Sequence, residues 1–201
     1  LLTSTKSTET FIILGRDERE HGLGTQIREA LPHARIDTLE APTRGAAETC
    51  FRFGEHLEND QPLLILDCDL RFASVAFDAS VREACRGAAS FDAMVPTFEA
   101  RAPRYSYIRT DSQGVALEVA EKKVISDRAI AGAYFFTRAN TFLDLAEQKL
   151  QKPLAESDEY YIAHLLADLV AQSGRLRVVP TEFWESFGTP EELSRSVGAG
   201  T

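Results

Sequence analysis

Two carboxylates, Asp67 and Asp69, stand on either side of one residue directly after the apolar run at residues 62–66. In an extended chain, residues i and i+2 point to the same side, so both carboxylates could face one ligand. Paired carboxylates supply the oxygen ligands that Mg²⁺ and Mn²⁺ prefer. The spacing therefore predicts a metal role, with Asp69 the preferred ligand. The alternative is a pair of acids that only solubilise a loop.

A second group with chemical potential is Glu121-Lys122-Lys123, which ends a strand-like segment. Glu accepts hydrogen bonds from hydroxyls, and Lys neutralises phosphate as a compact point charge. Such a pair suits a sugar phosphate, although charged triplets are usually solvated turns. If the strand continues through the triplet, Lys123 faces the side opposite to Lys122.

Two glycines stand where a ligand could approach the backbone. Gly45 precedes a predicted helix whose free N–H groups could contact a phosphate or a base, and an ordinary capped helix start is the alternative. Gly132 lies inside a strand-like segment, where glycine marks a close approach or a simple bulge.

Apolar runs and helical spacing predict the elements that position these residues. Strands are predicted at residues 10–14, 34–39, 62–66, 92–99, 105–110, 115–121, 130–136 and 176–179. Helices are predicted at residues 22–31, 46–57, 138–149 and 158–173, and a docked C-terminal helix follows the cap Thr189.

The first half thus alternates as β-α-β-α-β, which predicts a parallel sheet with helices on both faces. Ligands in such sheets bind beyond the carboxyl ends of the strands, where Asp67 and Asp69 stand. The second half predicts a hairpin insertion that makes the sheet mixed. With 201 residues and no linker or repeat, a single domain over residues 1–201 is expected.

Composition narrows the function classes. The net charge of −9 opposes binding to nucleic acid or to an anionic membrane, and no apolar run reaches the ~20 residues of a membrane span. Three cysteines without a CxxC motif predict reduced, buried thiols in a cytoplasmic protein. The histidines have no metal-ligand spacing, and GxSxG, HExxH and GxGxxG are all missing from the sequence.

The order and spacing of several motifs resemble the sugar nucleotidyltransferases, including their capsule and lipopolysaccharide glycosyltransferase-like members. The resemblance implies a three-layer αβα sandwich, Rossmann-like and of the GT-A type, with a mixed, mainly parallel sheet. It is carried by residues 45–49 (GAAET), 63–69 (LLILDCD), 118–134 (EVAEKKVISDRAIAGAY), 159–162 (EYYI) and 187–193 (FGTPEEL).

The resemblance also implies the reaction and the residues that serve it. A sugar phosphate, or a similar phosphomonoester, attacks the α-phosphorus of a nucleoside triphosphate and releases pyrophosphate, which supplies precursors for cell-surface polysaccharide. The implied nucleotide-binding residues are Gly45, Ala46 and Asp67. The implied substrate-binding residues are Glu121, Lys122 and Gly132. Asp69 would hold Mg²⁺ or Mn²⁺, and Asp69 and Lys122 would be catalytic.

Two alternatives stay open. A GT-A glycosyltransferase shares the Asp-x-Asp motif but transfers the sugar itself, so it releases a nucleoside diphosphate instead of pyrophosphate. A non-catalytic sugar-nucleotide sensor or assembly subunit is the other, because the sequence departs from the family pattern in two places. The oligomeric state is left open, with a homo-oligomer compatible with the sequence.

The first departure is at the start, where the family's opening strand and Gly-rich phosphate loop have no counterpart. We therefore expect that an upstream segment is missing, and that a strand position beside residues 10–14 and 63–66 is unfilled. The second departure is Ser186, which stands where many members carry a second metal-binding Asp. Glu185 is the candidate substitute.

Overall fold

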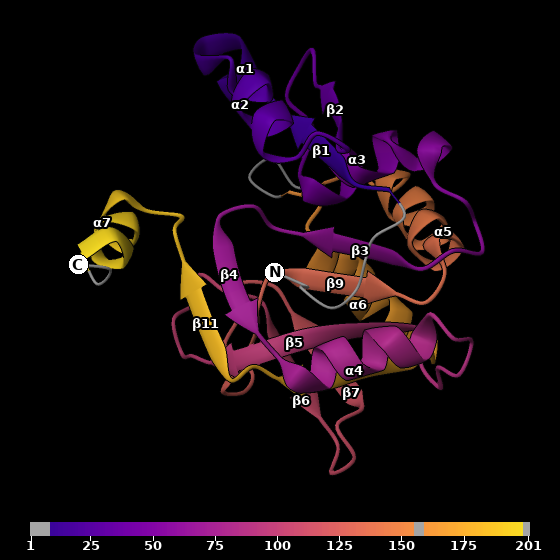
Figure 1. Ribbon diagram of the computed structural model, residues 1–201. Helices are drawn as coiled ribbons and strands as arrows, with labels where there is room; N and C mark the ends of the chain where they lie inside the picture. The colour runs from indigo at the N-terminus through magenta and orange to yellow at the C-terminus, as the bar shows by residue number, and fades with distance from the viewer. Residues whose placement is uncertain (1–8, 155–158, 199–201) are drawn as a thin grey trace.

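The computed structural model describes residues 9–154 and 159–198. Its main feature is a seven-stranded sheet in which β3, β9, β5, β8, β6 and β7 follow one another, with β10 added beside β5 (Figure 1). The strands are β3 (Leu63–Leu66), β5 (Ala93–Glu99), β6 (Tyr107–Thr110), β7 (Ala116–Ala120), β8 (Arg128–Ile130), β9 (Ala133–Phe136) and β10 (Leu176–Pro180).

The strand directions correct one part of the expected fold. β10 runs parallel to β5, whereas β3–β9, β5–β9, β5–β8, β6–β8 and β6–β7 are antiparallel pairs. A mixed sheet is confirmed, and a mainly parallel one is not. The physical reason is β9, which returns from the hairpin and inserts between β3 and β5. These two strands share one direction, since both are antiparallel to β9, but they are not neighbours.

Gly132 divides the strand expected at residues 130–136. Its φ of 74° lies in the left-handed region, which glycine enters without steric cost. The chain therefore leaves β8 at Ile130 and begins β9 at Ala133 with different neighbours.

Helices cover both faces of the main sheet, because side chains alternate between the faces along each strand. Met94 and Phe135 pack with α4 (Val75–Ala84) on one face. Val95 and Phe136 pack on the other face, in a cluster that also holds buried side chains of α3, α5 and α6. These helices are α3 (Ala46–Arg52), α5 (Ala139–Leu150) and α6 (Ile162–Ala171). The expected αβα layering is thus present around the central strands.

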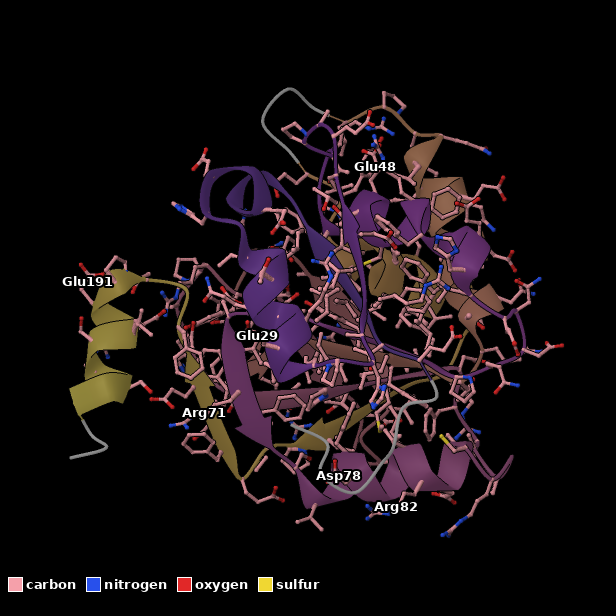
Figure 2. All side chains as sticks on the ribbon, turned by 45° about the horizontal axis from the view of Figure 1, so that its top comes forward. Glu29, Glu48, Arg71, Asp78, Arg82 and Glu191 are labelled. Carbon is pink, nitrogen blue, oxygen red and sulfur yellow. The ribbon has the colours of Figure 1, made fainter. Side chains whose placement is uncertain are left out.

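Helix α4 shows how one helix meets both the sheet and the surface. Ser74 precedes it and accepts a hydrogen bond from the backbone N–H of Phe77, a regular N-cap. Phe77 and Val81 are buried against the sheet. Asp78 and Arg82 lie on the same helix and are half-buried (Figure 2).

The N-terminal elements form a separate small layer. Strands β1 (Phe11–Leu14) and β2 (Arg35–Thr38) pair in parallel, and α1 (Arg16–His21) and α2 (Leu23–Ala30) connect them (Figure 1). Within the described residues, β1 pairs with no strand besides β2, and β3 with none besides β9. The expected strand between β1 and β3 stays a prediction.

A third group of elements carries the C-terminal motif. Strand β4 (Leu70–Ala73) follows β3 and pairs antiparallel with β11 (Phe183–Ser186). Helix α7 (Pro190–Gly198) comes next and lies to the side of the sheet (Figure 1). The Thr189 hydroxyl accepts a hydrogen bond from the Glu192 N–H, which confirms the expected cap. A short 3₁₀ turn, Gly54–His56, follows α3.

Candidate functional site

Asp67 lies in the connection between β3 and β4, against Gly132, which separates β8 from β9. Its backbone N–H donates to the carbonyl of Gly132 at 2.9 Å. A Cβ added to Gly132 would lie 2.7 Å from Asp67 Oδ2 and 2.2 Å from Leu70 Cδ2. The bare face of Gly132 is therefore filled by the Asp67 carboxylate and the Leu70 side chain.

Asp69 contacts the C-terminal motif instead. Its carbonyl accepts a hydrogen bond of 2.6 Å from the Phe187 N–H, and its Oδ2 lies 2.8 Å from where a Cβ of Gly188 would be. The structure thus brings together two motifs that are more than a hundred residues apart. Residues 67–69 form a bend and not an extended strand. The two carboxylates are therefore not brought close together by the alternation of an extended strand, and the argument from residues i and i+2 is wrong on this point.

Negative charge concentrates around Asp67. Burial, together with the charges of Asp69 and Glu121, raises the pKa of Asp67 to about 6. Beside it, burial first and then these charges raise the pKa of Tyr134 well above its usual value. The pKa of Cys50 is raised to about 12, chiefly by burial and also by Asp67, so this thiol is unreactive at neutral pH. We call Asp67, Asp69 and Glu121 the acidic centre.

The turn after β7 places the positively charged Lys122 next to Glu121 of the acidic centre. Strand β7 ends at Ala120 and does not continue through Glu121-Lys122-Lys123, so strand alternation does not apply to the two lysines. Lys122 has a φ of 51°, a left-handed conformation that is uncommon outside glycine. Its ammonium donates a hydrogen bond to the Tyr161 hydroxyl. The neighbouring Glu121 accepts a hydrogen bond from the Ser106 hydroxyl.

Gly45 has a role within the fold itself. Its φ is 133°, and an added Cβ would meet the backbone nitrogen and oxygen of Tyr160 at 2.7 and 2.8 Å. Tyr160 N–H donates to the Arg44 carbonyl, and Ala47 N–H donates to the Tyr160 carbonyl, both at 2.8 Å. The bare face of Gly45 is thus occupied by this chain, while Ala46 is exposed. Their nucleotide-binding role stays a prediction.

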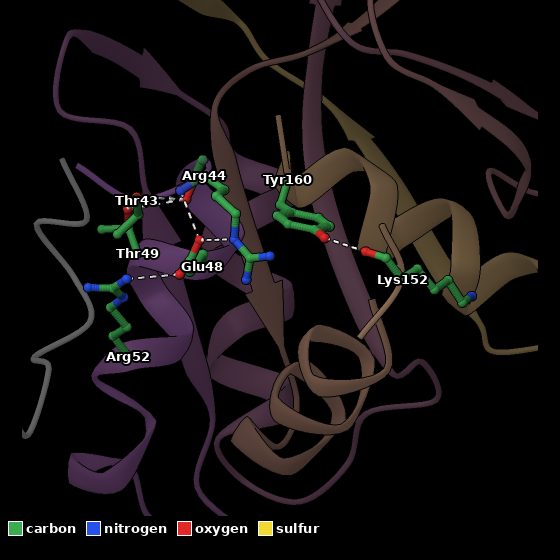
Figure 3. A network of polar contacts seen from close by, with 8 residues as sticks. Thr43, Arg44, Glu48, Thr49, Arg52, Lys152 and Tyr160 are labelled. Atoms are coloured by element: carbon green, nitrogen blue, oxygen red, sulfur yellow. Dashed lines mark hydrogen bonds and ion pairs between the residues drawn. The ribbon is translucent and has the colours of Figure 1, made fainter. Parts of the chain in front are cut away.

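A buried carboxylate fixes the same helix start (Figure 3). Glu48 is 8% exposed. Its Oε2 accepts from the backbone N–H and the Nε of Arg44, both at 2.8 Å, and its Oε1 accepts from Arg52 at 2.9 Å. Burial opposes the charge, but the Arg44 and Arg52 hydrogen bonds outweigh it and lower the pKa of Glu48 to about 2. The Arg44 guanidinium also lies 4.9 Å from the Tyr160 ring centroid.

The structure shows what surrounds the position of the missing second Asp. The Ser186 hydroxyl donates to Glu192 Oε2 at 3.0 Å and accepts from the Gly188 N–H at 3.2 Å. Glu192 also pairs with Arg104 at 2.6 Å. Glu185, the expected substitute, pairs with Arg71 of β4 at 2.6 Å. Both glutamates are therefore engaged by arginines.

The residues present are compatible with a magnesium site that the substrate completes. Among the described residues, no group of three or more His, Cys, Asp or Glu side chains is arranged to hold a metal ion. Mg²⁺ in phosphate-handling sites often takes one or two carboxylates, and substrate phosphates and water supply the rest. Asp67 and Asp69 meet that requirement. Burial first, and then the charges of Asp69 and Glu121, raise the pKa of Asp67, and a bound cation would stabilise its charged form.

Sequence reasoning missed three neighbours of the centre: Ser106, Tyr161 and Trp184. Trp184 Nε1 donates to the Ala131 carbonyl at 3.3 Å, and its ring stacks on Phe98 at a centroid distance of 3.7 Å. These two rings and Tyr105 line a cleft of about 470 Å³. The aromatic pair Phe183-Trp184 and the motif at residues 159–162, which contains Tyr161, were available signals in the sequence, whereas Ser106 carried none.

Comparison with known protein families shows which family the chain belongs to. The model of the nucleotidyl transferase family matches residues 2–197, nearly the whole chain. The chain belongs to the nucleotidyl transferase family. Transfer of a nucleotidyl group is thus the chemistry of its family. No curated protein sequence matches the chain.

Solved structures agree on the fold. A nucleoside-diphosphate-sugar pyrophosphorylase from Vibrio cholerae RC9 is 20% identical, with a TM-score of 0.75 over 94% of this chain and 80% of that one. A UDP-glucose pyrophosphorylase complexed with UDP-glucose is 16% identical, with a TM-score of 0.71 over 95% and 80%. The inositol-1-phosphate CTP transferase from T. maritima is 12% identical, with a TM-score of 0.67 over 92% and 72%.

Two further expectations can be compared with the structure. Along residues 9–154 and 159–198, no helix has the length and apolar character needed to cross a bilayer. Cys50, Cys68 and Cys85 form no disulfide with one another, and the expectation that the thiols are buried is wrong for Cys68 and Cys85, which are exposed.

Proposed function

We propose that this chain transfers a nucleoside monophosphate from a nucleoside triphosphate to a sugar phosphate or a similar phosphomonoester and releases pyrophosphate. Mg²⁺ or Mn²⁺ assists the reaction. The proposal includes a cytoplasmic location, one nucleotidyltransferase-like domain and a role in supplying precursors for cell-surface polysaccharide. The last of these rests on the motif resemblance to capsule and lipopolysaccharide enzymes.

The observation that carries the proposal is the meeting of three separate segments at one place. The bend after β3 supplies Asp67 and Asp69, the turn after β7 supplies Glu121, and the break at Gly132 lets the Asp67 carboxylate approach the backbone. Lys122 follows Glu121, and its ammonium interacts with the Glu121 charge. Phosphoryl transfer needs carboxylates that can hold a metal cation and a positively charged side chain that can bind a phosphate.

Each residue then has a defined task. A bound metal ion would neutralise phosphate charge, and Asp69 and Asp67 would hold it. Lys122 binds the phosphate of the acceptor, and Glu121 accepts hydrogen bonds from sugar hydroxyls. Gly132 contacts the sugar through its backbone, because its bare face is filled by Asp67 and Leu70. Gly45 and Ala46 contact the nucleotide base. Positioning and charge neutralisation are sufficient, because direct attack on the α-phosphorus needs no covalent enzyme intermediate.

Measurement of the released product tests the proposal. The full gene product is incubated with each nucleoside triphosphate, a panel of hexose 1-phosphates, and Mg²⁺ or Mn²⁺, and pyrophosphate is quantified. We expect pyrophosphate release that requires both substrates and the metal. A parallel thermal-shift series ranks the nucleotides, since stabilisation grows with the ratio of ligand concentration to Kd.

Two other outcomes would favour the alternatives. Release of a nucleoside diphosphate from a nucleotide sugar indicates a GT-A glycosyltransferase. Nucleotide binding without any turnover indicates a binding subunit. One observation favours the second alternative: Ser186 replaces an acid, and Glu185 and Glu192 are both paired with arginines.

A further inference from the structure

The Lys122 ammonium is held in a defined place by Tyr161. Besides the hydrogen bond to the Tyr161 hydroxyl, its Nζ lies 4.3 Å from the centroid of the Tyr161 ring. The left-handed backbone of Lys122 directs the side chain out of the β7 strand path. A flexible lysine is thus fixed at both its backbone and its charged end.

Tyr161 itself is supported from two sides. It directly precedes α6, and its ring meets the His164 ring edge-on, with centroids 5.6 Å apart. The preceding residue, Tyr160, is 1% exposed and is bonded through its backbone to Arg44 and Ala47. The phenol therefore stands on rigid structure, which is a requirement for a group that positions another.

The partner of Lys122 is neutral, although acids are near. Glu121 and Glu159 both interact electrostatically with its ammonium, but the hydrogen bond goes to the phenol. A full ion pair with a carboxylate would compete with an incoming phosphate. A neutral hydroxyl keeps the amine charged and oriented, yet it is displaced more easily by a phosphate, since charge-assisted hydrogen bonds are the stronger ones.

We propose that Tyr161 is a positioning residue, which holds the Lys122 ammonium beside the acidic centre, ready for the phosphate of the acceptor substrate. The inference rests on the proposed function of Lys122 and adds a determinant of acceptor affinity. A free lysine loses much rotamer freedom when it binds a phosphate, and a lysine that is held in advance loses less.

The kinetic test is a double-mutant cycle between Lys122 and Tyr161. Tyr161→Phe keeps the ring and should raise KM for the hexose 1-phosphate about threefold, and Tyr161→Leu about tenfold, with kcat and KM for the triphosphate nearly unchanged. In a Lys122→Ala background, Tyr161→Leu should change the acceptor KM less than about twofold. Equal losses in both backgrounds would overturn the inference, because a merely structural Tyr161 acts independently of Lys122.

The adjacent lysine supplies the matched control. Lys123→Ala changes the local charge by the same amount without removing the partner of Tyr161. The effect of Tyr161→Leu on the acceptor KM should therefore persist in the Lys123→Ala background. Loss of the Tyr161 effect there as well would mean that local charge, and not the Lys122 contact, carries the coupling.

A chemical readout separates this inference from the proposed function. Amine acetylation of the intact protein is followed by peptide mass spectrometry, with Lys123 as the internal reference. The ratio of Lys122 to Lys123 labelling should be low in the wild type and rise at least about threefold in Tyr161→Phe, and inorganic phosphate should lower it. An unchanged ratio overturns the inference even if pyrophosphate is released. No release from the wild type refutes the proposed function, while the ratio still shows whether Tyr161 holds Lys122.

Discussion

At the scale of single residues, Asp67 and Asp69 are not equivalent. Asp67 lies against Gly132 among buried groups, and its pKa of about 6 shows that its charge is opposed by its surroundings. Asp69 lies against the Gly188 loop, which carries the family's C-terminal motif. A ligand that bridges the two segments would contact Asp69, which agrees with its selection as the principal metal ligand.

Asp69→Asn should therefore abolish metal-dependent nucleotide binding and turnover while the fold persists, because the replacement is nearly isosteric. Binding of the triphosphate is titrated with and without Mg²⁺, and the unfolding midpoint is measured beside it. The exposed Asp60→Asn serves as the control and should change neither. Retained Mg²⁺ dependence in Asp69→Asn would show that Asp69 is not the ligand.

At the scale of elements, the break between β8 and β9 places Asp67. Gly132→Ala should destabilise the protein by about 1–2 kcal/mol for the left-handed backbone. Overlap with Leu70 and Asp67 should add about 1–3 kcal/mol. Gly87 has a similar φ of 77° with nothing within 4 Å of an added Cβ, so Gly87→Ala isolates the backbone cost. Urea unfolding compares the two, and equal losses would show that no overlap occurs.

The start of α3 should give the protein a distinct acid sensitivity through Glu48. Its folded pKa of about 2 is below the model value of 4.5. The stabilisation is therefore complete above pH 4.5 and is lost as the pH falls toward 2. The lowered pKa of Glu48 contributes at most about 3 kcal/mol to the free energy of unfolding.

The measurement is the difference in unfolding free energy between the wild type and Glu48→Gln as a function of pH. This difference should shrink between pH 4.5 and 2. The exposed Glu58→Gln provides the comparison and should show no such change. A difference that stays constant over this range would mean that the two arginines do not hold the charge of Glu48.

At the scale of the whole molecule, local stability should be highest in the elements that form the core and lowest in those at the edge. Helix α6 contributes Leu165 and Leu166 to the core, whereas Leu193 of α7 is 51% exposed and α7 is attached through the Glu192 contacts. Amide hydrogen exchange should therefore be slowest in α6 and in the central strands, and fastest in α7. Equal protection of α6 and α7 would contradict this order.

Local patterns in the sequence predict what is local in the fold. The strongly apolar strands β3, β5 and β9 and the helices α5 and α6 were predicted because their residues bury apolar side chains. Helix α4 was missed, although Ser74 and the spacing of Phe77 and Val81 were signals for it. Strands β4 and β11 are short and mixed in polarity, and they pair across more than a hundred residues. No local pattern encodes such a pairing.

The candidate site divides in the same way. Asp67, Asp69, Glu121 and Lys122 could be found because their types and positions after strands suggest chemistry. The contact between Lys122 and Tyr161 spans 39 positions and could not be found. The insertion of β9 between β3 and β5 was likewise beyond prediction, since it depends on which strand edges are free once the hairpin has formed.

The position of β9 also affects the order in which the protein can fold during synthesis. Among the described strands, β3 pairs with β9 alone, and the ends of the two are separated by 136 − 66 = 70 residues. At about 5–20 residues per second, the ribosome needs about 4–14 s to supply that partner. Throughout this interval the apolar segment Leu63–Leu66 emerges without its neighbour, and exposed strands of this kind promote aggregation. We therefore expect the nascent chain to be most prone to aggregation in the seconds before β9 appears.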